Sequence, residues 1–377
     1  MKIEKLALPD SAIDFLKSQG YDKLYPPQAD CIKSGLLNGK SILVSAPTAS
    51  GKTLIAMLAM LSYLSKNKGK VIYLSPLRAL AAEKFTEFKK LEKISIGNKI
   101  KTSISTGDFE HIEKNLENSN VLILTNEKMD SIIRHGAEWI DDIGLVISDE
   151  VHLIGDESRG PTLEMILTHL KLLDTKPQII GLSATITNSN EIADWLDCKL
   201  VKNDWRPVPL SEGVCDGGQV TMSDGETFEV KPSLRGIPID LGVQCVQQGG
   251  QSLVFAETRV RSKSLATKAS DVVSQLLQKK ELTALEKTSK QILAENEHTE
   301  IVKTLAILVK KGVAFHHAGL NQKCREIVEK EFRKGTIKLL SSTPTLAAGV
   351  NLPARRVVIS NITDTMQKLV QIDPLVF

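Results

Sequence analysis

Short apolar runs alternate with longer helical patterns through the first half of the chain. Segments such as Leu54–Leu64 and Leu163–Leu173 carry apolar residues at helical spacing. The apolar runs between such segments predict strands at Ile42–Val44, Val71–Leu74, Lys101–Ile104, Val121–Leu124, Leu145–Ile147 and Ile179–Leu182. Because strands that alternate with helices form parallel sheets covered on both faces, the pattern predicts an α/β fold.

The pattern breaks at residues 203–209, where two prolines and a tryptophan favour a hinge. Beyond it, Thr227–Val230 alternates like a hairpin strand, and a charged helical region covers Leu276–Leu308. A second α/β pattern predicts strands at Ser252–Phe255, Val313–Phe315, Lys338–Leu340 and Val357–Ile359. A length of 377 residues suits two domains, which the hinge puts at 1–205 and 206–377.

The composition narrows the class of protein without assigning a function. The net charge is +3, so any surface that binds nucleic acid must be local. The five cysteines contain no C-x-x-C pair, which argues against a zinc or iron–sulfur site and fits the reducing cytoplasm. Since no apolar run approaches the roughly 18 residues of a membrane span, we expect no membrane partner.

A candidate phosphate-binding loop lies between the first strand and the next helix. Its sequence is A-P-T-A-S-G-K-T at residues 46–53. Backbone N–H groups of such a loop and of the following helix point at the β-phosphate of a nucleotide, here through Ala49, Ser50 and Gly51. Lys52 is expected to reach the β- and γ-phosphates, and the Thr53 hydroxyl to hold Mg²⁺. The strand before and the helix after the loop make a chance match improbable.

An acidic pair follows the expected strand Leu145–Ile147. Asp149 at the end of this strand can hold the Mg²⁺ that bridges the nucleotide phosphates. Glu150 is then placed to orient the attacking water. By itself D-E-x-H also describes a solvated acidic turn, but its position at a strand end in the same domain favours catalysis.

Two weaker candidates flank this site. Ser183 and Thr185 follow the strand Ile179–Leu182 and could couple the nucleotide state to the acidic pair, although an ordinary capped turn has the same pattern. Gln28 precedes the first strand, and its amide can pair with both a donor and an acceptor on adenine. A solvated glutamine in an N-terminal loop is an equally good reading of Gln28 alone.

Taken together, the motifs resemble a superfamily 2 helicase of the Ski-two-like branch, similar to the archaeal HelQ/Hjm DNA repair helicases. The resemblance runs from about Tyr21 to about Val358. It rests on motifs that include L-Y-P-P-Q (24–28), S-A-P-T-A-S-G-K-T (45–53), S-P-L-R-A-L-A-A-E-K (75–84), D-E-V-H (149–152), L-S-A-T-I (182–186) and T-P-T-L-A-A-G-V-N-L-P-A-R (343–355). It implies two tandem RecA-like domains with parallel sheets, the second incomplete, and ATP between them, with Gly349 and Asn351 on the ATP side.

The resemblance also implies a track for a nucleic-acid strand. Such helicases hold a single strand mainly by its phosphates and sugars, which permits movement along any sequence. The residues at the matching motif positions are Arg78, Thr106, Gly107, Thr125 and Lys128 in the first domain, and Thr258, Arg259, His317, Gly319 and Thr343 in the second. Taken singly, each could equally be a solvated loop side chain.

The end of the chain departs from the family pattern. The family continues with a strand-separating hairpin and a Q-x-x-G-R-x-G-R motif that carries arginine fingers, and no G-R-x-G-R occurs in this sequence. Arg355 and Arg356 lie on a different element from the fingers. We therefore expect a C-terminally truncated chain, whether by truncation, frameshift or a split gene, in which ATP turnover is impaired.

The sequence predicts an ATP- and Mg²⁺-dependent DNA helicase core, an enzyme that moves 3′ to 5′ on single-stranded or forked DNA in replication-fork repair. We expect a cytoplasmic monomer. One alternative is an RNA helicase of the same branch, because both kinds grip the backbone of the strand. The other is a non-catalytic remnant that binds ATP and nucleic acid.

Overall fold

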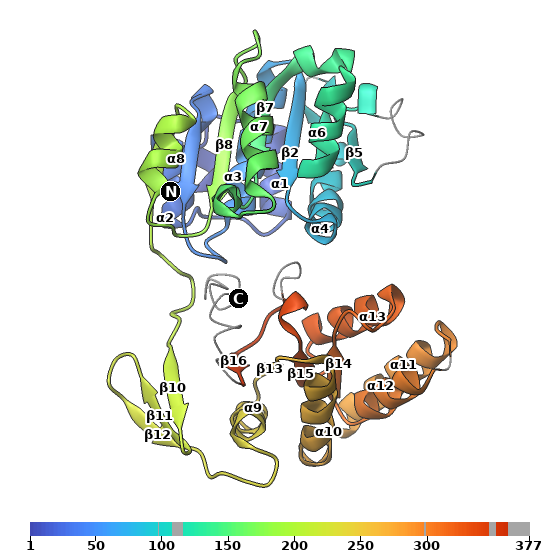
Figure 1. The fold of residues 1–377 in the computed structure, drawn as a ribbon. Helices are drawn as coiled ribbons and strands as arrows, with labels where there is room; N and C mark the ends of the chain where they lie inside the picture. The colour runs from blue at the N-terminus through green and yellow to red at the C-terminus, as the bar shows by residue number, and fades with distance from the viewer. Residues whose placement is uncertain (97, 108–115, 298, 347–351, 361–377) are drawn as a thin grey trace. The chain divides into compact units, whose positions relative to one another are not determined.

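The computed structural model describes residues 1–96, 98–107, 116–297, 299–346 and 352–360 (Figure 1). The chain divides into two compact units, Met1–Pro209 and Leu210–Phe377, and each is described here by itself. The division falls near the end of the expected hinge. Trp205, within the hinge, still belongs to the first unit, where its ring lies 4.6 Å from that of Tyr25.

The first unit is built on a parallel sheet in which all six expected strands are present. The strand order is β5-β6-β2-β7-β8-β1-β9. The strands are β1 (Ile42–Ser45), β2 (Lys70–Ser75), β5 (Thr102–Ser105), β6 (Val121–Thr125), β7 (Ile143–Ser148), β8 (Gln178–Ser183) and β9 (Lys199–Lys202). The sequence pattern missed β9 because this edge strand interleaves lysines with two apolar residues; it pairs in parallel with β1.

Successive residues of each strand point to opposite sides of the sheet, so apolar side chains lie on both faces. Helices cover each face. In β1, Ile42 and Val44 belong to one apolar core and Leu43 to another. The first core is completed by α1 (Asp10–Ser18), α2 (Pro26–Lys33), α3 (Lys52–Lys66) and α4 (Arg78–Phe88). The second is completed by α6 (Asn126–His135), α7 (Gly160–Lys171) and α8 (Ser189–Trp195), which cover the near face in Figure 1.

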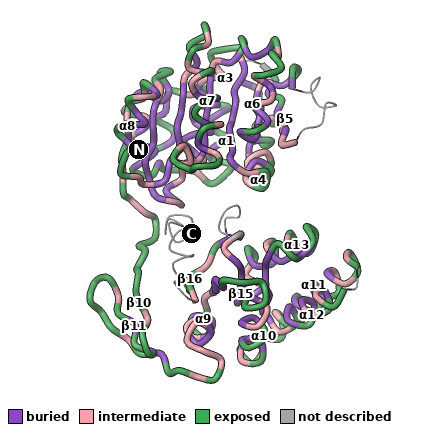
Figure 2. The backbone as a smooth tube through the Cα atoms, viewed as in Figure 1, coloured by how far each residue is buried: buried purple, intermediate pink, exposed green. Residues whose placement is uncertain are grey.

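Shorter elements complete the first unit. A two-stranded antiparallel ribbon joins β3 (Ser95–Ile96) to β4 (Asn98–Lys99). The 3-10 helices are Ile3–Lys5, Leu36–Asn38, Lys89–Lys93, Glu138–Asp142 and Val151–Gly155. The five inner strands of the main sheet are buried along nearly their whole length (Figure 2), whereas the edge strands β5 and β9 are partly exposed.

The second unit begins with an antiparallel sheet of three strands, β10 (Gly213–Asp216), β11 (Gln219–Met222) and β12 (Thr227–Glu229). The expected hairpin strand is β12. Most residues of this sheet are exposed (Figure 2).

A parallel sheet forms the core of the second unit, with the order β14-β15-β13-β16. The strands are β13 (Ser252–Phe255), β14 (Val313–His316), β15 (Leu339–Ser342) and β16 (Arg356–Ile359), close to the expected ranges. The helices are α9 (Ile237–Gln247), α10 (Arg259–Gln275), α11 (Lys279–Ala294), α12 (Glu300–Lys310) and α13 (Gln322–Arg333), with a 3-10 turn at Pro344–Leu346. The expected helical region Leu276–Leu308 is thus two helices. The α/β class and the two parallel sheets are confirmed, while the expectation of an incomplete second sheet concerns residues outside the described ones.

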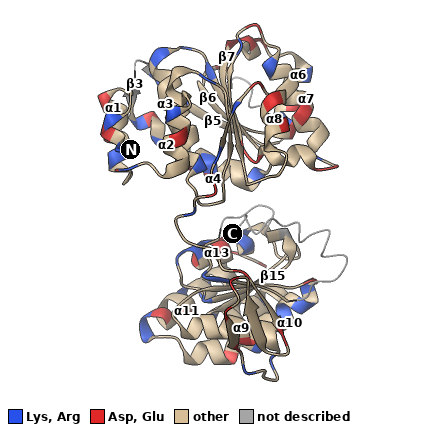
Figure 3. Cartoon of the chain, turned by 90° about the vertical axis from the view of Figure 1, so that its left-hand side faces the viewer, with Lys and Arg blue, Asp and Glu red and all other residues tan. Residues whose placement is uncertain are grey.

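Charged residues of both signs are interspersed along the helices of each unit (Figure 3). This distribution agrees with a net charge of only +3. Within the described ranges, no helix combines the length and the apolar character needed to cross a membrane.

Candidate nucleotide-binding site

The loop between β1 and α3 has the tight backbone that a phosphate cradle requires. Ala49 and Gly51 both have positive φ angles, 64° and 82°. A Cβ atom at Gly51 would lie 2.1 Å from Gln28 Nε2, so only glycine fits. Because α3 begins at Lys52, its first backbone N–H groups and its positive dipole end face the loop. Lys52 Nζ donates to the carbonyl oxygens of Ala46 at 2.9 Å and Pro47 at 3.4 Å.

Gln28 is buried beside this loop and is held at both ends of its amide. Its Oε1 accepts from the Tyr25 backbone N–H at 2.7 Å, and its Nε2 donates to the Gly51 carbonyl at 3.1 Å. The side chain therefore ties the start of α2 to the phosphate loop. Its expected pairing with adenine stays a prediction.

The acidic pair follows β7, next to β2 in the sheet. The Asp149 backbone N–H donates to the Leu74 carbonyl at 2.9 Å, which extends the sheet register to this residue. Both carboxylate oxygens of Asp149 are engaged: Oδ2 accepts from the Tyr73 hydroxyl at 2.5 Å and Oδ1 from the Glu150 backbone N–H at 3.1 Å. Burial, with a further effect of Asp149, raises the pKa of Tyr73 well above its usual value, so the hydroxyl stays a donor.

Tyr73 makes a contact with the candidate site that the sequence did not indicate. In the run V-I-Y-L it has the pattern of an ordinary buried strand residue, and it lies far from Asp149 along the chain. Only the pairing of β2 with β7 brings the two side chains together. A tyrosine in an otherwise aliphatic strand was the one available signal, since a buried hydroxyl needs a partner.

Small hydroxyl side chains lie between the phosphate loop and the acidic pair. β8 pairs with β1 on one side, Ser183 opposite Ser45, and with β7 on the other. The buried hydroxyl oxygens of Ser50, Ser183 and Thr185 have no hydrogen-bond partner among the described residues. Buried polar atoms normally find partners, so these oxygens, together with Lys52 and the start of α3, fit a bound phosphate group and its metal.

His152 adds a neutral imidazole to the site. Its Nδ1 lies 3.4 Å from Glu150 Oε2. Burial, followed by the positive charge of Lys52, lowers the pKa of His152 to about 4. The contact with Glu150 is therefore not a charged pair at neutral pH.

In the first unit, the residues expected to contact nucleic acid follow β2, β5 and β6, which form the other half of the same sheet. Arg78 after β2 is exposed, and Thr106 and Gly107 after β5 are partly exposed. After β6, Thr125 and Lys128 are buried, and Thr125 Oγ1 accepts from the Lys128 backbone N–H at 3.4 Å as the N-cap of α6. Arg78 is therefore the most accessible charged candidate of the five.

In the second unit the candidates also gather at the carboxyl ends of neighbouring strands. Thr258 caps α10 and, with Arg259, is exposed, whereas His317 and Thr343 are buried. The Gly319 backbone N–H donates to His317 Nδ1 at 3.1 Å, and a Cβ on Gly319 would lie 3.7 Å from Arg259. Burial, followed by the Arg259 charge, lowers the pKa of His317. These loops form one polar edge.

Of the four remaining expected residues, the structure describes two, Arg355 and Arg356. Gly349 and Asn351 lie outside the described residues. Arg355 donates to the Gln248 carbonyl at 3.0 Å, and Arg356 to the Leu241 carbonyl at 3.0 Å. Both guanidinium groups are thus occupied against α9 and its C-terminal end.

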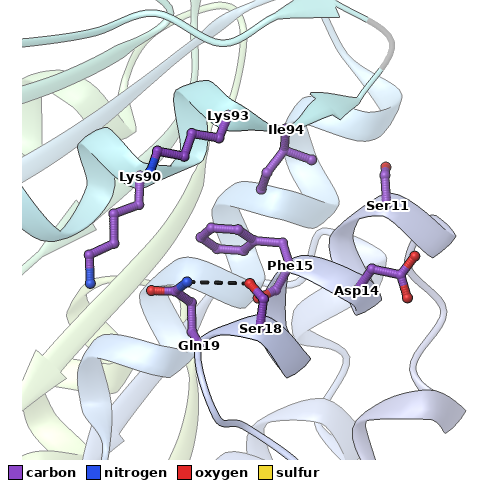
Figure 4. Close-up of a pocket in the computed structure, with 8 residues that line it drawn as sticks. All are labelled: Ser11, Asp14, Phe15, Ser18, Gln19, Lys90, Lys93 and Ile94. Carbon is purple, nitrogen blue, oxygen red and sulfur yellow. Dashed lines mark hydrogen bonds between the residues drawn. The ribbon is translucent and has the colours of Figure 1, made fainter.

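A separate surface hollow lies between α1 and the segment Lys89–Ile94 (Figure 4). Its lining residues are Ser11, Asp14, Phe15, Ser18, Gln19, Lys90, Lys93 and Ile94. The Gln19 amide donates to Ser18 Oγ at 3.3 Å. None of these residues belongs to the expected nucleotide or strand sites. Over the part of the chain that the structure describes, no group of three or more His, Cys, Asp or Glu side chains could hold a metal.

Comparison with known families gives two matches. Residues 25–192 match the DEAD/DEAH box helicase family, and residues 273–372 match the helicase conserved C-terminal domain. The first match covers the phosphate loop, the acidic pair and the hydroxyl residues described above. The second begins at the end of α10 and covers β14, β15 and β16 of the second unit, but not β13.

Comparison with individual proteins finds relatives named ATP-dependent DNA helicase Hel308. The protein from Methanocella arvoryzae is 44% identical over 360 residues, which are 95% of this chain and 48% of the relative. The protein from Pyrococcus horikoshii is 44% identical over 359 residues, 95% of this chain and 48% of the relative. The protein from Caldivirga maquilingensis is 43% identical over 364 residues, 96% and 47%. The chain thus spans about half the length of these relatives.

Proposed function

Because this chain belongs to the superfamily 2 helicases, in the Ski-two-like branch, we propose that it is the core of an ATP-dependent DNA helicase. The first unit binds ATP at the phosphate loop and grips single-stranded DNA at the other half of its sheet edge. The preference for DNA over RNA is supported by the relatives, which are named as DNA helicases.

The observation that supports this proposal most strongly is the order β7-β8-β1 in the first sheet. Because these strands are parallel neighbours, their carboxyl ends bring Asp149 and Glu150, Ser183 and the phosphate loop to one edge. Three motifs that lie far apart in the sequence therefore meet in one place. A chance match to any one of them would not produce this arrangement.

Each residue has a defined task in the proposed reaction. Lys52 and the N–H groups at the start of α3 bind the phosphates. Thr53 and Asp149 would hold Mg²⁺, which neutralises charge on the β- and γ-phosphates when bound. Glu150 orients a water for attack on the γ-phosphorus and accepts its proton, while the bond from the γ-phosphorus to the β–γ bridging oxygen breaks and ADP leaves. Ser183 and Thr185, between the two groups, transmit the change in the phosphates to the acidic pair.

The finer features rest on the resemblance to repair helicases of the Ski-two-like branch. These are movement in the 3′-to-5′ direction, action at replication forks, and a monomeric state. A cytoplasmic location rests on the scattered cysteines and their fit to a reducing compartment.

Hydrolysis of ATP with and without a single-stranded oligonucleotide tests the proposal. We expect the oligonucleotide to stimulate turnover, and Glu150→Gln to abolish it while Mg-ATP still binds, because the amide keeps the shape but cannot accept a proton. Glu157→Gln, an exposed position just beyond the acidic motif, is the matched control and should leave turnover unchanged. Equal turnover in Glu150→Gln and the parent would remove Glu150 from the reaction.

A further inference from the structure

The carboxyl edge of the first sheet is divided into two halves. In the order β5-β6-β2-β7-β8-β1, the first three strands are followed by the candidate contacts to nucleic acid. The last three are followed by the candidate nucleotide-binding residues. Two side-chain hydrogen bonds link the halves: the Tyr73 hydroxyl on β2 donates to Asp149, and Lys84 on α4 donates to Thr53. Both acceptors are residues that we propose to hold Mg²⁺.

The contact of Lys84 is close and largely shielded from solvent. Lys84 Nζ lies 2.7 Å from Thr53 Oγ1, and the lysine side chain is 13% exposed. Two carboxylates of the same helix lie nearby, Glu87 at 3.5 Å and Glu83 at 3.9 Å from the ammonium. Lys84 therefore has Thr53 as its nearest partner and acidic neighbours that can receive it if that partner is withdrawn.

The ammonium group and a divalent cation make opposing demands on the same atom. A hydroxyl that holds a metal does so through its oxygen, which is the atom that accepts the Lys84 hydrogen bond. Two like charges at one oxygen also repel each other, and strongly so in a site that is shielded from water. A metal–nucleotide complex and the observed position of Lys84 therefore exclude each other.

We propose that Lys84 is a positioning residue that competes with Mg²⁺ for the Thr53 hydroxyl, so that a bound magnesium–nucleotide releases α4 from the start of α3. The proposal rests on the proposed function of the phosphate loop. It gives α4 a specific role, because this helix begins at Arg78, the exposed candidate contact for a nucleic-acid strand. The displaced ammonium passes to Glu87, one helical turn along.

Calorimetric titration of ADP into the whole chain, once with Mg²⁺ and once with EDTA, tests the proposal without any turnover. The measured quantity is the ratio of the two affinities, which reports how much the metal contributes. Lys84→Met removes the competing ammonium and should raise this ratio about tenfold, the effect expected for one hydrogen bond from a charged group. Lys84→Gln removes the charge but keeps a donor, so it should raise the ratio by a smaller factor. Lys17→Met removes an exposed ion pair with Glu4 in the same unit and should leave the ratio unchanged.

A second measurement on the same proteins is their affinity for a single DNA strand. Binding of Mg-ADP should change the affinity for an oligo-dT strand in the parent, and this change should shrink in both Lys84 variants, since the two ligands must affect each other equally. Melting temperatures establish that each variant is folded. The glutamine variant can still donate to Thr53, so it keeps the test open if the methionine variant does not fold.

The outcomes separate the two hypotheses. If the parent binds no Mg-ADP, both the proposed function and the role of Lys84 are wrong. If the parent binds Mg-ADP but the folded Lys84 variants keep the parental ratio, or lower it, only the role of Lys84 is overturned.

Discussion

At the scale of single residues, the candidate nucleotide site is made of polar groups that are buried and hydrogen-bonded to their neighbours. Asp149 is 8% exposed, yet both of its carboxylate oxygens accept hydrogen bonds. The Gln28 amide accepts a hydrogen bond from the Tyr25 backbone N–H and donates one to the Gly51 carbonyl. Because a buried polar group that loses its partner costs more than an exposed one, small substitutions here should have measurable effects.

His152 should make stability depend on pH. Its pKa is lowered to about 4 by burial and by Lys52, from a value near 6.5 in the unfolded chain. Below pH 6.5 the unfolded chain therefore takes up a proton that the folded protein takes up only near pH 4. The free energy of unfolding should fall as the pH decreases through this window, by up to about 3 kcal/mol.

Denaturant unfolding at several pH values between 4 and 7 measures this dependence. We expect His152→Gln to flatten the curve in that window, while His169→Gln, an exposed histidine on α7, leaves it as in the parent. An unchanged slope in His152→Gln would show that another group is responsible.

At the scale of elements, the arrangement follows from parallel strands whose carboxyl ends share one edge. β2 and β7 are neighbouring strands. Between them, the half of the sheet edge with the candidate nucleic-acid contacts meets the half with the candidate nucleotide residues. A single buried hydrogen bond, from Tyr73 to Asp149, joins their ends. The ring of Tyr73 also meets that of Phe88 on α4 at 5.0 Å, so the same residue connects both strands to this helix.

Tyr73→Phe tests this connection. The variant keeps the ring and its packing but removes the donor to Asp149, which should lower the free energy of unfolding by about 1–3 kcal/mol. Mg-ATP should also bind more weakly, because the carboxylate loses its fixed position. Tyr63→Phe removes a hydroxyl from α3 and is the control for the binding measurement. Its affinity for Mg-ATP should match that of the parent. Full Mg-ATP affinity in Tyr73→Phe would show that Asp149 needs no such support.

Arg78 at the start of α4 should contribute to the binding of single-stranded nucleic acid through its charge alone. Arg78→Ala should weaken binding of single strands of any sequence and reduce the slope of log affinity against log salt by about 0.7, the value for one phosphate contact. Arg134→Ala, an exposed arginine paired with Asp130 on α6, is the matched control. A loss that depends on base sequence would contradict a contact with the backbone of the strand.

At the scale of the whole molecule, the sequence predicted most of the fold because the information lay in local patterns. Apolar runs between helical segments identified ten strands of the two parallel sheets, and the hinge expected at the two prolines near Trp205 stays a prediction. β9 was missed because an edge strand needs few apolar residues. The break between α11 and α12 was also missed, although Thr299 is the N-cap of α12.

The site was predictable only where a motif carries its own chemistry. Lys52 and Asp149 were predicted as site residues from their sequence context and stay predictions, whereas their neighbours Tyr73 and Lys84 were not predicted. Tyr73 and Lys84 reach Asp149 and Thr53 only through sheet order and helix packing, which no local pattern encodes. The buried positions of Thr125 and Lys128 likewise follow from the cap of α6 and not from the residue types.

The central claim is that the loop between β1 and α3 binds Mg-ATP, and calorimetric titration of Mg-ATP into the whole chain tests it most directly. The account predicts saturable binding of one nucleotide per chain, with affinity at least about tenfold lower in Lys52→Ala because a charged contact to the phosphates is lost. Lys68→Ala, an exposed lysine beyond the other end of α3, should bind like the parent. Equal affinity in the parent and in Lys52→Ala, with both proteins folded, would contradict the account.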